Sequence, residues 1–404
     1  MNYFKSTELA EKYGVSRRTI TNWIEQTRQG RLNLELVEDS GRHYISNNPK
    51  NHLIMKGLVP LRRKFLNTLS LKHAQPIPEF YKLYSKAQIL DIITNIETGR
   101  EISREYNYID EGAYFWDGYA QRLYEDKSPN MLNSTIKLLD LNLKYIESLL
   151  ERYKYVNIVD VGVGNALPTK ALTEHFLKTG KLKRYIGIDI SPTMLEVAEH
   201  NLKKWFGEDV KFEGYCKNIS FERFSEVIAE PPAKETANLV LVLGGTLGNF
   251  REPEDGIRTI MHSMQRSDLL AYTVALDSPT MRNRFSFPLT AEEPLPPQYK
   301  FIVDKLGIDP SFYDVEVGFN EQESARYLQI RLKHALNITF TMDGYEWLVS
   351  LNKDDKILLW RARHESATQV VNHFSNNRFN PLQVSKTPDN DYMLLLATLQ
   401  REER

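Results

Sequence analysis

Two aspartates and two glycines near the middle of the chain have the spacing of a ligand-binding turn. Asp160, Gly162 and Gly164 end one short apolar segment, and Asp189 ends the next one about 25 residues later. Glycine lets the backbone turn tightly and come close to a ligand. In a βαβ unit this spacing places the second carboxylate against a ribose diol. A third glycine, which would favour a dinucleotide, is missing, so the pattern predicts S-adenosylmethionine (SAM) as the cofactor.

A second glycine-rich segment follows the apolar run Leu239–Leu243. Gly244, Gly245 and Thr246 open this segment, and Asn249 lies near its end. Ligands of open α/β sheets bind beyond the carboxyl ends of the strands. We therefore expect a second wall of the same site here, where the Asn249 amide offers both a donor and an acceptor.

The elements that position these motifs alternate between strand and helix over residues 151–284. This alternation predicts a doubly wound, Rossmann-like α/β core. Its expected strands are Asn157–Val161, Arg184–Asp189, Val210–Tyr215, Ala237–Leu243 and Leu269–Leu276. On either side we expect a proline-punctuated linker at 61–85, a helical substrate-binding lid at 86–150, and a small α/β substrate domain at 285–404.

Residues 1–60 have the pattern of two helices followed by a hairpin. The helical periodicity breaks at Tyr13–Ser16, and Ser16 is placed to cap the second helix. Through residue 65 there are twelve basic and six acidic side chains, a net charge of +6 in a chain whose total is −1. The pattern resembles a winged helix-turn-helix of the MerR/excisionase type, whose second helix enters the DNA major groove. The resemblance implies binding of duplex DNA through the residues Arg17, Arg18, Thr21, Asn22 and Arg42.

The composition limits the remaining possibilities. Among 404 residues Cys216 is the only cysteine, which excludes internal disulfides and a cysteine-based metal site. No apolar run approaches the ~20 residues of a membrane span, and the first residues lack an apolar signal region. We therefore expect a cytoplasmic protein without a membrane partner. For the N-terminal unit, docking of a protein partner or formation of a homodimer is the alternative to DNA binding.

From about Tyr106 to the C-terminus the chain resembles the histidine Nα-methyltransferases of the ergothioneine pathway, which methylate an α-amine with SAM. The segments that carry the resemblance are Tyr108–Asp117, Asp160–Gly164, Gly187–Ser191 and Gly244–Phe250. It implies that Tyr108 and Trp116 line the substrate pocket and that Tyr108 and Asn249 orient the amine. It also implies that Asp189 holds the ribose and that Lys217 and Asn218 lie beside the adenine. Asp160 either supports the glycine turn or contacts the SAM amine.

Two departures from that family concern the substrate. Leu123–Pro129 keeps only a tyrosine, Tyr124, and a proline of the family's stretch at this position. The segment Ile357–His364 carries apolar and basic residues where the family has a glutamate and a serine that contact the imidazole. A pocket without these contacts argues against histidine. We expect an amino acid or another small amine as substrate, with Arg361 favouring an acidic side chain, and we expect His364 on the surface of a helix.

Two other classes of function stay open at this stage. The chain could be a DNA-binding transcription regulator whose methyltransferase-like domain senses SAM or an amino acid. It could also be a methyltransferase that the N-terminal unit directs to nucleic acid. Transfer from a sulfonium to a neutral amine requires positioning and neither a metal nor a covalent intermediate. Release of S-adenosylhomocysteine separates an enzyme from a sensor.

Overall fold

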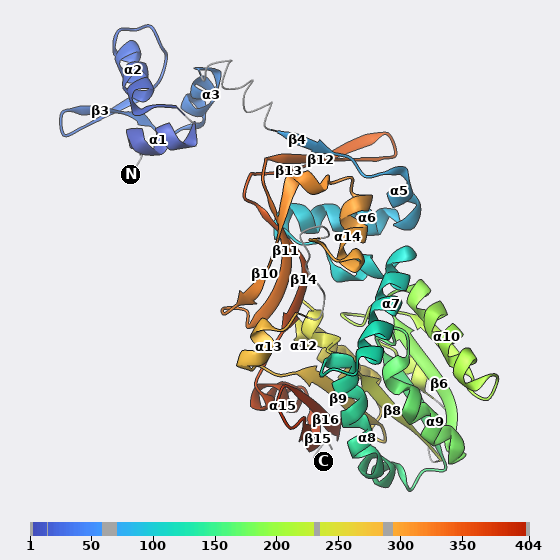
Figure 1. The fold of residues 1–404 in the computed structure, drawn as a ribbon. Coiled ribbons are helices and arrows are strands. Elements are labelled where there is room, and N and C mark those ends of the chain that lie inside the picture. The colour runs from blue at the N-terminus through green and yellow to red at the C-terminus, as the bar shows by residue number, and fades with distance from the viewer. Residues whose placement is uncertain (1–2, 14, 59–70, 230–234, 286–293, 401–404) are drawn as a thin grey trace. The chain divides into compact units, whose positions relative to one another are not determined.

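The chain divides into two compact units, Met1–Lys72 and His73–Arg404. This computed structural model describes residues 3–13, 15–58, 71–229, 235–285 and 294–400 (Figure 1). In the described part, no helix is long and apolar enough to cross a membrane.

In its described residues, the N-terminal unit packs three helices against a small antiparallel sheet of order β1-β3-β2. Ser16 caps the second helix, because its hydroxyl accepts from the backbone N–H of Thr19 at 3.1 Å. Leu9, Ile20 and Ile45 lie in its core. The elements are β1 (Tyr3–Phe4), α1 (Ser6–Lys12), α2 (Arg17–Arg28), β2 (Leu36–Asp39), β3 (Arg42–Ser46) and α3 (Pro49–Leu58).

The second unit is built on a seven-stranded sheet of order β15-β16-β9-β8-β5-β6-β7. The strands β5 to β9 are parallel, and β16 joins β9 in antiparallel pairing. The strand order reverses between β5 and β8, which is the switch point where such sheets bind ligands. The strands are β5 (Tyr155–Val161), β6 (Leu182–Asp189), β7 (Phe212–Cys216), β8 (Thr236–Val242), β9 (Leu269–Ala275), β15 (Phe379–Lys386) and β16 (Tyr392–Leu399).

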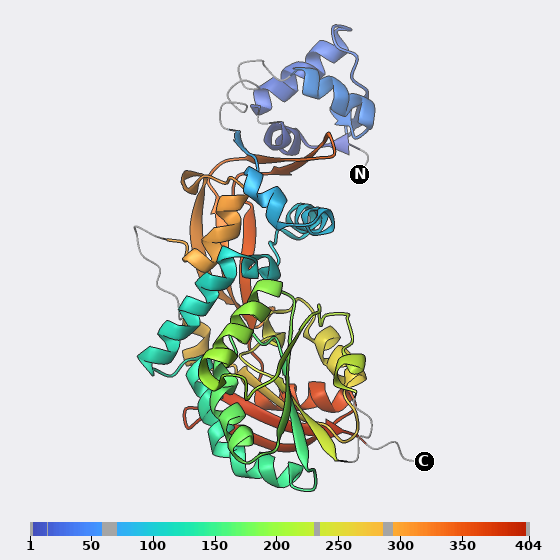
Figure 2. The same ribbon diagram turned by 90° about the vertical axis from the view of Figure 1, so that its right-hand side faces the viewer.

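Helices cover both faces of this sheet, as Figure 2 shows. One face packs against α8 (Met131–Leu150), α9 (Lys170–Lys178) and α10 (Pro192–Phe206). The other face packs against α11 (Ser225–Ile228), α12 (Pro253–Ser263) and α15 (Ala367–Asn376). Both cores consist of aliphatic and aromatic side chains, which explains the near-continuous apolar runs of the parallel strands.

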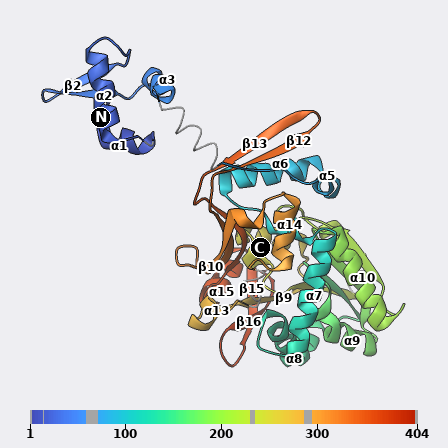
Figure 3. The same cartoon turned by 45° about the horizontal axis from the view of Figure 1, so that its top comes forward.

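A second layer of the same unit contains two three-stranded sheets of orders β10-β11-β14 and β13-β12-β4. The β12–β13 hairpin runs alongside α6 (Figure 3). The strands are β4 (Lys72–Ala74), β10 (Tyr313–Asn320), β11 (Ala325–Leu332), β12 (Leu336–Met342), β13 (Tyr345–Leu351) and β14 (Lys356–Arg363). The helices are α5 (Pro78–Leu83), α6 (Lys86–Thr94), α7 (Glu111–Asp126), α13 (Pro279–Asn283) and α14 (Pro297–Lys305), with short helical turns η1 (Asn95–Gly99), η2 (Arg104–Tyr108), η3 (Leu167–Thr169), η4 (Leu247–Asn249) and η5 (Pro310–Phe312).

The structure corrects three of the expected domain boundaries. The second half of the expected linker at 61–85 is structured, because β4 and α5 bury Ala74 and Phe80 in the core of the second layer. The first part, 61–70, lies outside the described residues. The expected lid at 86–150 is divided, because α8 packs on the seven-stranded sheet through Leu138 and Ile146. The expected C-terminal domain at 285–404 is divided as well, because β15, β16 and α15 complete the sheet of the core.

Candidate functional site

The carboxyl ends of β5, β6, β7 and β8 open into a cavity of ≈ 480 Å³. This volume is in the range of ordinary small-molecule sites, roughly 300–1,000 Å³. The loops after all four strands line it, and a further wall comes from η2 and α7. The cavity therefore lies at the switch point of the sheet, as the sequence predicts.

The glycine turn after β5 closes against the loop after β8. Gly162 and Gly164 have φ angles of +74° and +54°, a region that side chains rarely adopt. A Cβ at Gly162 would lie 2.9 Å from Cγ2 of Thr246, which lines the cavity. Gly244 and Gly245 also have positive φ angles, of +69° and +73°. The backbone favours glycine at all four positions, and at Gly162 the packing requires it as well. The two predicted motifs face each other across the contact between Gly162 and Thr246.

Asp189 is held at the end of β6 by two backbone donors. Its Oδ2 accepts from the N–H of Gly164 at 3.1 Å, and its Oδ1 accepts from the N–H of Ser191 at 3.0 Å. Burial raises the pKa of this carboxyl above its usual range, and the two backbone bonds oppose that shift. Each oxygen keeps a further lone pair, and Asp189 lines the cavity. This geometry fits a carboxylate that receives two hydroxyl donors.

Asp160 lies beneath the glycine turn, buried at the end of β5. Its Oδ2 accepts from the hydroxyl of Tyr185 at 2.6 Å, and that hydroxyl also meets Thr169 at 2.6 Å. Burial raises the pKa of Asp160 to about 7. Asp160 lines the cavity as well, so its position suits both roles that the sequence leaves open.

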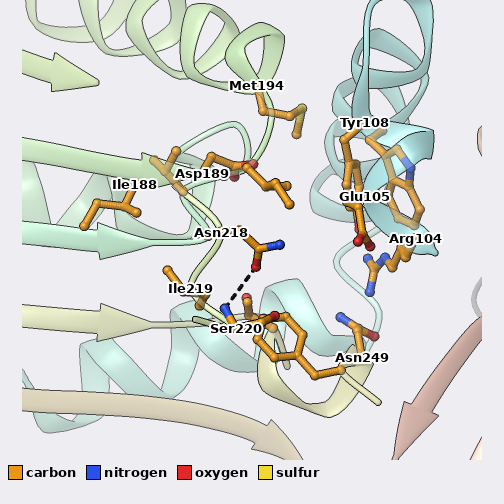
Figure 4. A pocket seen from close by; sticks show the side chains of 18 of the residues that line it. Arg104, Glu105, Tyr108, Ile188, Asp189, Met194, Asn218, Ile219, Ser220 and Asn249 are labelled. Atoms are coloured by element: carbon orange, nitrogen blue, oxygen red, sulfur yellow. Dashed lines mark hydrogen bonds between the residues drawn. The ribbon is translucent and has the colours of Figure 1, made fainter. Parts of the chain in front are cut away.

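The loop after β7 brings Asn218 to the cavity and turns Lys217 away from it. The Oδ1 of Asn218 accepts from the N–H of Ser220 at 3.0 Å (Figure 4), and both residues line the cavity. The Lys217 ammonium pairs with Glu226 at 2.7 Å and is not part of the lining. The expectation that the Lys217 side chain lies beside the adenine is therefore wrong.

An aromatic wall faces the strand ends. The rings of Tyr108 and Trp116 lie 5.1 Å apart, and the Arg104 guanidinium stacks on both, 5.2 Å and 4.7 Å from their centroids. Burial raises the pKa of Tyr108 to about 12, so its phenol stays protonated at neutral pH. All three side chains line the cavity, and Asn249 lines it from η4, where its Nδ2 donates to the carbonyl of Gly245 at 3.2 Å. Tyr108, Trp116 and Asn249 thus line the same cavity.

Three other expected site residues are not part of the lining. Gly245 contributes backbone geometry only, and Tyr124 is 46% exposed on α7. Arg361 is buried on β14, where its Nη2 donates to Oε2 of Glu101 at 2.5 Å. The cavity is therefore lined by Glu101 and not by the guanidinium of Arg361. The expectation that Arg361 favours an acidic side chain in the substrate is wrong.

The structure adds residues that the motifs do not include. Glu101, Arg104 and Glu105, in and just before η2, all line the cavity. The sequence signal was their position immediately before Tyr108. His364, expected on a helix surface, is buried before α15 and accepts from Nε of Arg326 at 2.8 Å. Burial lowers its pKa to about 3, so it stays neutral.

Comparison with known proteins gives a family match for part of the chain. Residues 87–280 match the model of a family described as histidine-specific, SAM-dependent methyltransferases. The chain is a SAM-dependent methyltransferase, and SAM is its cofactor. The matched segment contains β5 to β9 and the aromatic wall but ends before β14. No curated protein matches the chain.

Solved structures of methyltransferases resemble the chain only distantly. A SAM-dependent methyltransferase from Clostridium acetobutylicum is 10% identical, with 78% of this chain and 100% of that chain covered and a TM-score of 0.36. The 1,6-didemethyltoxoflavin N1-methyltransferase of Burkholderia thailandensis is 11% identical, with 81% and 94% covered and a TM-score of 0.37. A SAM-dependent methyltransferase from Anabaena variabilis is 12% identical, with 71% and 95% covered and a TM-score of 0.37. With TM-scores this low, none of the three supports a conclusion about this chain.

Proposed function

We propose that the chain transfers a methyl group from SAM to the amine of a small molecule, an α-amino acid other than histidine. The observation that carries this proposal is that Asp189, Asn218, Tyr108 and Asn249 line one cavity. Asp189 would hold the ribose and Asn218 the adenine, against the glycine turn of Gly162. When bound, SAM supplies an electrophilic methyl group on a sulfonium.

The chain's own contribution is to orient the acceptor amine. Tyr108 keeps its hydroxyl proton and can donate a hydrogen bond, while the Asn249 amide can both donate and accept. Holding the amine in line with the methyl group removes much of the entropic cost of the reaction.

The choice against histidine rests on β14. There the sequence has Trp360, Arg361 and Ala362, and Arg361 is engaged with Glu101 outside the cavity lining. The glutamate and serine that would contact an imidazole from this strand are absent, and histidine binding loses those two contacts. The matched family segment ends before this strand, so the family description does not bear on it.

The test is release of S-adenosylhomocysteine across the twenty amino acids and the common polyamines. We expect turnover with one amino acid or a few and little with histidine. Asn249→Ala should abolish turnover and leave SAM affinity nearly unchanged, because its amide contacts the acceptor. Efficient histidine methylation would contradict the substrate proposal. Tight SAM binding without any turnover would favour the sensor function instead.

We further propose that the N-terminal unit is a winged helix-turn-helix that binds duplex DNA. In support, Arg17, Arg18, Thr21 and Asn22 are exposed on α2, and Arg42 is exposed at the start of β3, next to the turn of the β2–β3 hairpin. These positions form one helix face and a wing tip, the two elements that such domains place on DNA. DNA binding together with SAM binding but no turnover would favour a transcription regulator. DNA binding together with methylation of a DNA-bound target would favour a methyltransferase directed to nucleic acid.

A further inference from the structure

Two oppositely charged neighbours, Arg104 and Glu105, point into the cavity from η2. Figure 4 shows both on the side opposite Asp189 and Asn218, with Asn249 nearby. Neither side chain forms an ion pair with another residue among those the structure describes. Charged groups that face a binding cavity without an ion-pair partner are available to a ligand.

The Arg104 guanidinium is positioned to bind an anion. Its guanidinium is fixed by stacking on Tyr108 and Trp116, at 5.2 Å and 4.7 Å from the ring centroids. Its Nε is buried and has no hydrogen-bond partner. A planar guanidinium with free donors in a fixed orientation is well suited to a carboxylate.

The Glu105 carboxylate is positioned to bind a cation. Its half-buried carboxylate has lost part of its hydration without gaining a side-chain partner. Burial raises its pKa, the charges of Asp91 and Glu101 add to that rise, and Arg104 opposes it. Tyr108 is a further titratable neighbour, and it is protonated at neutral pH. An ammonium group would replace the missing hydration, and a raised pKa makes the carboxylate a better proton acceptor.

We propose that Arg104 and Glu105 bind the two charged groups of a zwitterionic acceptor, with Arg104 on the carboxylate and Glu105 on the amine. This inference rests on the proposed function and names two residues that recognise its substrate class. Glu105 accepts one proton from the ammonium, which leaves a neutral amine with a free electron pair. The N–C bond then forms as the S–CH₃ bond breaks, which yields S-adenosylhomocysteine and a methylated ammonium. The proton on Glu105 passes to solvent.

The experiment compares each accepted amino acid with the matching amine that lacks the carboxylate. Arg104→Gln should raise the KM for the amino acid roughly tenfold or more, the loss of a charge-assisted bond. The same variant should leave the KM for the decarboxylated amine unchanged. Glu105→Gln should lower kcat and move the acidic limb of the pH–rate profile to higher pH, because the amine must then deprotonate without an internal acceptor.

The controls are Arg122→Gln and Glu125→Gln, two exposed positions on α7 outside the cavity lining. Calorimetry with S-adenosylhomocysteine should give wild-type affinity for all four variants, which shows that the cofactor site is intact. The inference is overturned if Arg104→Gln raises the KM equally for the amino acid and for the amine, or if Glu105→Gln leaves the pH–rate profile unchanged. Either result leaves the proposed function standing. Wild-type turnover only with acceptors that have no amine would overturn the proposed function itself.

Discussion

The backbone N–H of Gly164 donates to Oδ2 of Asp189 at 3.1 Å, which ties the turn after β5 to the end of β6. This bond leaves the carboxylate fixed and pointing into the cavity before any ligand arrives. Preorganisation of this kind reduces the cost of binding, because the side chain has already lost its rotational freedom. Binding of SAM should therefore depend on Asp189 directly.

Asp189→Ala should weaken SAM binding by ~1–3 kcal/mol, the size of lost charge-assisted hydrogen bonds to the ribose. Isothermal titration calorimetry measures the change. Asp140→Ala, which removes an exposed carboxylate from α8, is the matched control and should bind like wild type. An unchanged affinity in Asp189→Ala would contradict the role of this residue.

Gly162→Ala should damage both stability and SAM binding. The substitution forces a φ of +74° on alanine and places its Cβ 2.9 Å from Cγ2 of Thr246. Gly180→Ala has a similar φ of +68° with open space around it, so it should cost only the left-handed backbone strain, about 1–2 kcal/mol. The melting temperature of Gly162→Ala should be lower than that of Gly180→Ala. Adding Thr246→Ser to Gly162→Ala should recover part of this difference. Equal melting temperatures for the two alanine variants would show that the contact with Thr246 does not matter.

Asp160 should make the protein less stable as the pH rises. Burial raises its pKa from 3.8 to about 7, so the folded state holds a proton that the unfolded state releases between these values. The favourable contribution is complete below pH 3.8 and is lost as the pH rises through about 7. Asp160→Asn should flatten the dependence of unfolding free energy on pH across this interval. Asp268, whose pKa burial raises to about 6, is present in both proteins and cancels in the difference. Parallel pH profiles would rule out a raised pKa at Asp160.

The full chain should bind duplex DNA through α2. Arg17→Ala with Arg18→Ala should weaken binding strongly, because each arginine is expected to neutralise a phosphate and release counterions. Affinity of the wild type should fall steeply as salt increases, and the double variant should show a shallower slope. Lys203→Ala with Lys204→Ala on α10 removes the same charge elsewhere and should leave binding unchanged. A gel shift without any affinity at low salt would favour a protein-docking role for the unit.

The core of the site could be predicted from local sequence alone. The strands β5, β6, β8 and β9 are short apolar runs, and positive φ angles at Gly162 and Gly244 need glycine. Both features act over a few residues, and the carboxyl ends of parallel neighbours meet at one edge of a sheet. The sequence therefore determined where the cofactor cavity lies and that Asp189 and Asn249 share it.

Long-range pairing decided the rest. β16 adds to β9 in antiparallel register, and α8 packs on the same sheet, although the sequence assigned both to substrate domains. Glu101 and Arg361 are 260 positions apart, yet their ion pair removes a positive charge from the cavity and leaves Glu101 in its lining. A periodic pattern shows which face of an element is apolar, but not which element covers that face. Only the tertiary structure decided that choice, because it depends on how all the buried surfaces fit together.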